Sequence, residues 1–148
     1  MHTEHMQNVS VGRVVAGWLV AAAVASLVAL VLLGTGVMDD ETTSANTWWS
    51  MIAIAVGFFM GGFFTGFRAL QAPVLHAVGI GLTSLAAWFI LNAVSALAFE
   101  GAWTWPAISP EFAIGLLLLQ FVATVLGSLV GYNVALRGRP GLSEHEPI

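Results

Sequence analysis

The chain has neither cysteine nor lysine, and charged residues occupy only 8% of its 148 positions. The absence of cysteine excludes disulfides, thiolate metal ligands and cysteine nucleophiles. Soluble domains carry about 25% charged residues, so the low charge, 58% hydrophobic residues and a mean hydropathy of +0.89 favour an integral membrane protein. The net charge of −4 offers no basic surface to a nucleic-acid partner.

Signatures of catalysis are also missing. The chain has no HExxH, no GxSxG and no phosphate-binding glycine loop. No Asp, Glu, Lys or Arg lies centrally in a long apolar segment, where proton pumps, ion-coupled transporters and voltage sensors place such residues. The groups His2/His5 and Glu144-His145-Glu146 lie in polar tails, and we interpret them as incidental rather than as metal ligands. We therefore expect a protein that is not an enzyme, with no catalytic residue, metal or cofactor.

Four long apolar segments predict an all-α fold, an integral membrane four-helix bundle. At 1.5 Å per residue, about 20 apolar residues in a helix span the roughly 30 Å hydrocarbon core. Polar tails at 1–10 and 137–148 flank a single transmembrane domain, residues 11–136. Pro73 fits the first turn of a helix, where its missing N–H does no harm. The expected helices are at about 11–33, 47–70, 73–99 and 112–136.

The first segment, 11–33, has one competing interpretation, a cleaved signal peptide. One arginine precedes the main apolar run, and Ala23-Val24-Ala25 is an acceptable cleavage site. The apolar residues continue beyond that site, however, and no polar mature sequence follows there. We therefore expect a retained membrane-spanning helix.

Arginines determine the expected orientation. All of them lie on one side of the membrane, whereas the acidic residues of the two longer loops lie on the other, so the positive-inside rule places both termini in the cytoplasm. Tryptophans at the outer boundary fit the role of interfacial anchors. The predicted location is the cell (inner, cytoplasmic) membrane of a bacterium, with the arginines near anionic lipid headgroups. These arginines are Arg13, Arg68, Arg137 and Arg139, and the outer tryptophans are Trp48, Trp49, Trp103 and Trp105.

Residues 57–68 (GFFMGGFFTGFR) form a glycine-rich stretch on the second predicted helix. In water each helical glycine costs about 1 kcal/mol relative to alanine, but a bilayer enforces the helix and glycine then permits close approach of a second helix. The pairs Gly57/Gly61 and Gly62/Gly66 are offset by about 100°, so they form one broad groove or serve two neighbours. With three other helices in the chain, one face is available for another subunit. The predicted helix-packing residues are Gly57, Gly61, Gly62, Gly66, Gly81, Gly127 and Gly131.

Polar residues inside the apolar segments are the candidates for an intramembrane site: Ser84, Asn92, Gln120, Thr124 and His76. Asn92 and Gln120 lie about 9 and 12 Å inside the outer ends of their helices, so we expect their amides to hydrogen-bond across the interface. Such residues are either structural links between helices or the lining of a polar spot for substrate or water.

Helical spacing places several of these residues on two stripes, which we expect to face each other in a tight seam. His76, one turn into the third helix, is expected at the inner interface, where it can snorkel, cap a helix or contact a lipid phosphate. The stripe of the third helix comprises Gly81, Ser84, Trp88, Asn92 and Ser95, and that of the fourth Gln120, Thr124, Gly127, Gly131 and Ala135.

The chain also has the pattern of a duplicated helical hairpin. Each half runs outward, crosses an acidic, tryptophan-flanked loop, and returns on a glycine-rich helix that ends in arginine. Both hairpins have the same orientation, so the duplication would be a parallel repeat.

The glycines also carry a resemblance. The Gly-Gly-x3-Gly-x-Arg end of the second helix, His76-x2-Gly79-x-Gly81, and Gly127-x3-Gly131 resemble a loose group of small four-helix bacterial membrane proteins with a GGxxAGR-like second helix. In this chain Thr65 stands where that group often has alanine, and Phe67 separates Gly66 from Arg68. The resemblance implies a fold and no catalytic activity.

Two functions fit these patterns. The first is a non-catalytic membrane subunit or scaffold in the lipid bilayer that associates through its glycine faces, as a homo-oligomer or with another membrane protein. The alternative is a small transporter or channel whose pathway is lined by Ser84, Asn92, Gln120 and Thr124. Neither needs a nucleic-acid partner.

Overall fold

The computed structural model describes residues 9–39, 44–69, 72–98 and 110–138. Four helices make up this part of the chain, which contains no strand. Each helix is long and apolar enough to cross a membrane. The prediction of an all-α fold with four helices long and apolar enough to span a membrane is thereby confirmed for the described residues. The helices are α1 (Val11–Gly34), α2 (Ser44–Arg68), α3 (Pro73–Ala98) and α4 (Pro110–Arg137).

The observed bounds differ most from the expected ones at the start of α2, which begins at Ser44 instead of about residue 47. Asn46 is buried and fixes this first turn, because its side chain binds the backbone of Asp39 in the preceding loop. The Asp39 N–H donates to Asn46 Oδ1 at 3.4 Å, and Asn46 Nδ2 donates to the Asp39 carbonyl at 3.1 Å. This contact between loop and helix has no signature in the local sequence.

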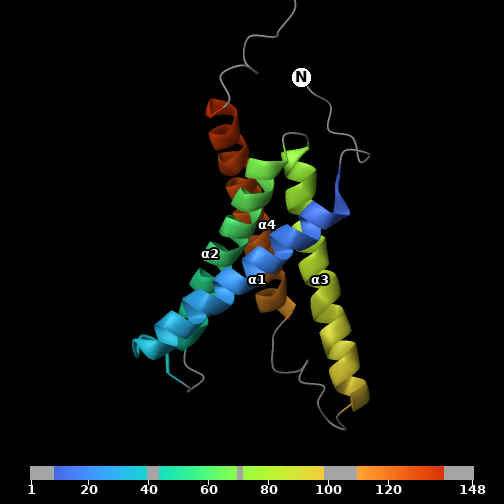
Figure 1. The fold of residues 1–148 in the computed structure, drawn as a ribbon. Helices are drawn as coiled ribbons and strands as arrows, with labels where there is room; N and C mark the ends of the chain where they lie inside the picture. The colour runs from blue at the N-terminus through green and yellow to red at the C-terminus, as the bar shows by residue number, and fades with distance from the viewer. Residues whose placement is uncertain (1–8, 40–43, 70–71, 99–109, 139–148) are drawn as a thin grey trace, which may run out of the picture.

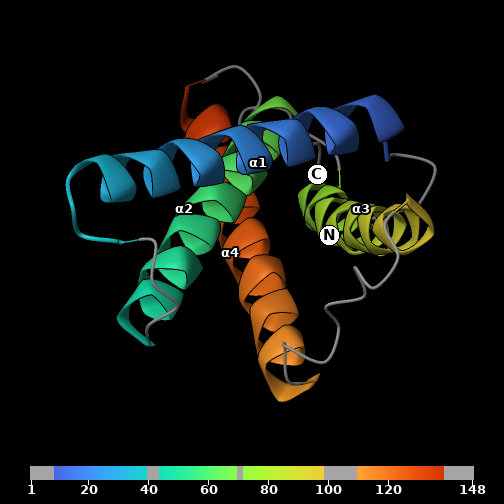
Figure 2. The same ribbon diagram turned by 90° about the horizontal axis from the view of Figure 1, so that it is seen from below.

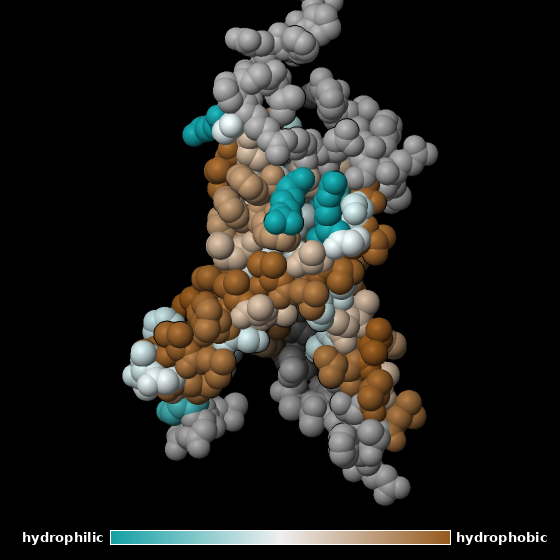
Figure 3. Space-filling model, in the orientation of Figure 1, coloured by the Kyte–Doolittle hydropathy of each residue, from teal (hydrophilic) through white to brown (hydrophobic). Residues whose placement is uncertain are grey.

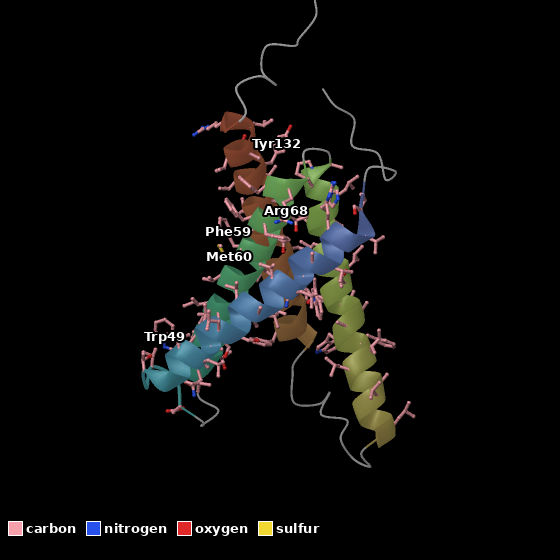
Figure 4. All side chains as sticks on the ribbon, in the orientation of Figure 1. Trp49, Phe59, Met60, Arg68 and Tyr132 are labelled. Carbon is pink, nitrogen blue, oxygen red and sulfur yellow. The ribbon has the colours of Figure 1, made fainter. Side chains whose placement is uncertain are left out.

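Helix α2 packs between α1 and α4, and α1 crosses the pair obliquely (Figures 1 and 2). Helix α3 lies beside the others at one end and diverges from them towards the other (Figure 1). Figure 4 labels a residue at each end of α2, and we call these ends of the bundle the Arg68 end and the Trp49 end. Figure 3 shows the molecule from the same side as Figure 1. Hydrophobic residues cover most of the described surface on that side, with small hydrophilic patches.

The contact of α1 with α2 is antiparallel and lies at Gly57 and Gly61. A Cβ placed on Gly57 would lie 2.5 Å from the Ala21 carbonyl oxygen and 2.6 Å from the Ala25 Cβ. On Gly61, a Cβ would lie 2.5 Å from the Gly17 carbonyl oxygen. The backbones are therefore too close for any side chain larger than hydrogen at these two positions.

The contact of α2 with α4 is parallel and uses the other glycine pair. A Cβ on Gly62 would lie 2.9 Å from the carbonyl carbon of Thr124, and one on Gly66 would lie 2.6 Å from that of Ser128. In the opposite direction, a Cβ added to Gly127 would lie within 3.0 Å of the Phe59 carbonyl, and one added to Gly131 would lie within 3.0 Å of the Phe63 carbonyl. The two glycine pairs of α2 thus serve two neighbours, both in the same chain.

The expected partner of Gly127 and Gly131 was wrong. Helical spacing predicts that they lie on a stripe facing the third helix, but their close contacts are with α2. The physical reason is that Gly62 and Gly66 allow α2 to approach α4 to backbone distance, whereas a side chain of α4 stands between α4 and α3. A Cβ added to Gly81 of α3 would lie 2.6 Å from the ring of Phe121 of α4.

Candidate functional site

Buried polar side chains lie along the contacts between helices. Those of Thr65, His76, Gln120, Thr124 and Ser128 are all at least nine-tenths buried. No fully enclosed side-chain N or O atom in the described part of the chain lacks a hydrogen bond. This is the normal condition for polar groups in a low-dielectric interior, where an unpaired group is costly.

His76 links the start of α1 to the start of α3. Its ring is 0% exposed. The backbone N–H of Ser10, the residue before α1, donates to Nε2 at 3.1 Å, and Nδ1 lies 2.9 Å from the Ala72 carbonyl oxygen. Because a carbonyl only accepts and a backbone N–H only donates, these two contacts assign the donor role to Nδ1 and the acceptor role to Nε2.

The expectation that His76 snorkels or contacts a lipid phosphate was therefore wrong. The side chain is enclosed by the bundle, and both ring nitrogens are engaged within the protein. Of the roles expected for it, the one compatible with this geometry is capping, because Nε2 accepts an N–H at the start of α1. In this geometry His76 links the start of α1 to the start of α3.

Ser128 makes a second link, from α4 to the start of α3. Its hydroxyl donates to the Pro73 carbonyl at 2.8 Å, and the side chain is fully buried. The Pro73 carbonyl lies in the first turn of α3. Sequence spacing gave one signal for Ser128, since it follows Thr124 by four residues on the same helix face.

Replacing Ser128 by alanine should lower the free energy of unfolding by about 1 kcal/mol, the usual net value of one buried hydrogen bond. Thermal unfolding in detergent micelles would measure the change. Ser26→Ala on the exposed face of α1 is the matched control and should leave the midpoint unchanged. Equal midpoints for Ser128→Ala and wild type would contradict the assigned bond.

Thr65 and Thr124 are enclosed and satisfied within their own helices. The Thr65 hydroxyl donates to the Gly61 carbonyl at 2.9 Å, and the Thr124 hydroxyl donates to the Gln120 carbonyl at 2.6 Å. The backbone of Thr124 lies against Gly62. Thr124 therefore lies in a closed helix contact, and its hydroxyl faces no open space.

Ser84 and Gln120 form a polar pair between α3 and α4. The Ser84 hydroxyl donates to Gln120 Oε1 at 3.0 Å. The expected partner of Gln120 was Asn92, which follows Ser84 by two helical turns on α3 and whose side chain lies outside the described part of the structure. Of the five candidate polar residues, the structure joins Ser84 directly to Gln120 and places Thr124 one turn further along α4.

The described arginines are exposed near the Arg68 end of the bundle. Arg13 lies in the first turn of α1, Arg68 ends α2 and Arg137 ends α4, while Arg139 lies outside the described residues. The Arg68 guanidinium lies 4.8 Å from the centre of the Phe64 ring, a cation–π contact. Within the described ranges, no group of three His, Asp or Glu side chains is placed to hold a metal ion.

An apolar groove of about 350 Å³ runs between α2 and α4. Its walls include Phe59 and Met60 of α2, labelled in Figure 4, and Val122 and Leu126 of α4. None of the residues that line it carries a charged or hydrogen-bonding side chain. The groove suits hydrocarbon and offers no group that could orient a polar substrate.

In comparisons with known proteins, no family model, curated protein or solved structure matches the chain. The resemblance to small four-helix bacterial membrane proteins therefore stays a prediction.

Proposed function

We propose that the chain is a non-catalytic membrane subunit that associates with another membrane-spanning chain along the distal half of α3 (residues 85–98). One observation carries this proposal. Phe89, Ile90 and Leu91 are consecutive and 62%, 59% and 66% exposed. Consecutive helical residues point in directions about 100° apart, so these three side chains are uncovered on three different sides of the helix.

The first hairpin provides the contrast. In the second half of α1, Ala25, Val28, Ala29 and Leu32 are half-buried at spacings of three and four residues, as expected for one face packed on a neighbour. In the distal half of α3 only Ala87 and Ala93 are half-buried among the described residues, and the large residues Val94 and Leu97 are exposed as well. It is thus the segment best suited to receive a partner.

This proposal moves the association surface away from the glycines. Gly57 and Gly61 lie against α1, and Gly62 and Gly66 lie against α4, so the faces first expected to bind a second subunit are covered by the chain itself. The alternative function, transport along Ser84, Asn92, Gln120 and Thr124, is less well supported because Thr124 lies inside the closed contact of α2 with α4.

The proposal includes a duplicated hairpin with both termini in the cytoplasm. It is supported by the symmetry of the α2–α4 contact. Gly62 lies against Thr124 as Gly127 lies against Phe59, and Gly66 lies against Ser128 as Gly131 lies against Phe63. The residues that take the same part in these contacts, which we call counterparts, are 65 positions apart (127 − 62, 131 − 66, 124 − 59 and 128 − 63). Shifting 11–34 by 65 gives 76–99, close to α3, and shifting 44–68 gives 109–133, close to α4. Gly79 lies against Val14, its own counterpart at this shift. The exposed arginines at the Arg68 end support the orientation.

Native mass spectrometry after gentle extraction from the source membrane tests the association. We expect a complex whose abundance falls at least several-fold in Leu91→Trp, because a bulkier side chain would hold the partner away from α3. Leu27→Trp is the matched control, since Leu27 is similarly exposed but lies on α1, and it should leave the complex intact. A wild-type chain that is monomeric under all extraction conditions would sink the proposal.

A further inference from the structure

The antiparallel contact of α1 with α2 brings two arginines together at the Arg68 end of the bundle. The Thr65 hydroxyl of α2 is the nearest atom to a Cβ placed on Gly17 of α1, so the helices touch at this level. One turn further towards the Arg68 end leads forward along α2 from Thr65 to Arg68, and backward along α1 from Gly17 to Arg13. Residues three or four positions apart are neighbours on a helix surface. Arg13 and Arg68 therefore lie on either side of the α1–α2 junction, one turn beyond the contact.

Both arginine side chains are exposed, and that of Arg68 is oriented by a neighbour. Its guanidinium lies 4.8 Å from the centre of the ring of Phe64, one turn earlier on α2. Figure 3 shows a hydrophilic patch directly above the hydrophobic band of α1, and Figure 4 labels Arg68 there. The cation–π contact restricts the guanidinium and leaves most of its five N–H donors for an anion.

The pair lies where two membrane-spanning segments end. The apolar span of α2 ends at Arg68, and that of α1 starts at Val11, two residues before Arg13. Arginine side chains at such positions extend to the headgroup level, where the phosphate groups of lipids lie. From Arg13 inward, α1 exposes apolar side chains, among them Val15 at 41% and Leu19 at 56%. A lipid whose phosphate lies at the pair can therefore place its acyl chains against α1.

We propose that Arg13 and Arg68 form a binding site for the phosphate of one anionic phospholipid. Two guanidinium groups at one place repel each other, and a phosphate between them replaces this repulsion by two attractions. Each guanidinium presents its donors in a planar fork that matches two phosphate oxygens. The bound lipid would join α1 to α2 beyond the glycine contact. The site uses no residue of α3, so it is independent of the proposed association.

An anionic phospholipid fits the pair better than a zwitterionic lipid or a free phosphate ion. A zwitterionic headgroup carries an ammonium group and would bring a third positive charge to the two arginines. A phospholipid is held at this depth by the bilayer, whereas a free phosphate ion has to give up hydration to enter. The competing ligands within the chain are carboxylates of the polar tails, such as Glu4 and Glu144.

Native mass spectrometry of the purified full-length chain in micelles, titrated with palmitoyl-oleoyl phosphatidylglycerol, tests the proposal. We expect the dissociation constant of the first bound lipid to rise about five-fold in Arg13→Gln and in Arg68→Gln, the effect of one basic residue at an anionic surface. Arg137→Gln is the matched control, because it removes the same charge from the same end of the bundle, and it should stay close to wild type. Arg68→Lys keeps the charge without the fork and should bind more weakly than wild type.

Each outcome decides the proposal. Weakening in Arg13→Gln and Arg68→Gln alone, with thermal midpoints in lipid-free micelles close to that of wild type, supports the site. Equal weakening in Arg137→Gln means that net charge alone attracts the lipid, and it overturns the proposal. Wild-type binding as weak as that of Arg68→Gln also overturns it and leaves the pair to a carboxylate of the tails. Displacement of the lipid by inorganic phosphate at constant ionic strength overturns the lipid and identifies a soluble phosphate group as the ligand.

Discussion

Replacing Gly62 by isoleucine is expected to disrupt the bundle itself, with a loss of about 3 kcal/mol or more of unfolding free energy. The added side chain would overlap the backbone of Thr124, which has no flexible end that can move aside. Overpacking by small increments already costs about 1–3 kcal/mol, and here α2 and α4 must separate along their length. The same reasoning applies to Gly66, which lies against the backbone of Ser128. Thermal unfolding in micelles would measure the loss.

Gly115→Ile supplies the control for this experiment. Gly115 is on α4, and a Cβ there would meet nothing within 4 Å. That variant should unfold close to the wild-type midpoint, while insertion into the membrane should be normal for all three variants. If Gly62→Ile unfolds at the wild-type midpoint and only loses a partner, the glycine face would bind another subunit rather than α4.

Replacing His76 by alanine is expected to cost about 2–4 kcal/mol. The substitution removes the partner of the half-buried Ser10 N–H and one partner of the Ala72 carbonyl, where the cost approaches at most the roughly 1–3 kcal/mol of a buried unsatisfied donor. It also leaves a cavity, which adds to the loss. The effect should be local to the junction of α1 with α3. Hydrogen exchange at residues 10–14 should therefore accelerate more than exchange in the centre of α2, in addition to the fall in thermal midpoint.

A conservative variant distinguishes the bond from simple volume. Glutamine at position 76 carries an oxygen that can accept from Ser10 and an amide N–H that can donate, so His76→Gln should recover part of the loss. His76→Leu fills the space without an acceptor and should not protect residues 10–14. If residues 10–14 were equally protected from hydrogen exchange in His76→Ala, His76→Gln and His76→Leu, the hydrogen bond from Ser10 would contribute nothing.

The helices themselves could be predicted from the sequence because a bilayer leaves little choice. An apolar run such as 11–33 has no water to satisfy its backbone, so it forms a helix whatever its glycine content. The ends were harder to predict. The start of α2 depends on Asn46 reaching back to Asp39, a contact that exists only once the loop is folded.

Which faces meet was not predictable from spacing alone. The spacing of Gly127 and Gly131 identifies a close-packed face, but any of three helices could cover it. The expected partner, the third helix, is wrong, because α2 covers this face. For His76 the sequence does carry a signal. Pro73, His76, Ala77, Ile80 and Gly81 recur at the spacing of a single helix face, and the structure buries all five. A histidine on that stripe belongs to the interior rather than to the lipid boundary.

The parallel contact of α2 with α4 has a consequence for biosynthesis. The ribosome delivers helices in order, so the first hairpin can close as soon as α2 has entered the membrane. The other glycine face, at Gly62 and Gly66, has to wait until Thr124 and Ser128 arrive, 62 residues later in each case (124 − 62 and 128 − 66). During that interval the insertion machinery or lipid must shield a bare backbone surface. Truncation after the third helix should therefore leave an intermediate that remains bound to the insertion machinery.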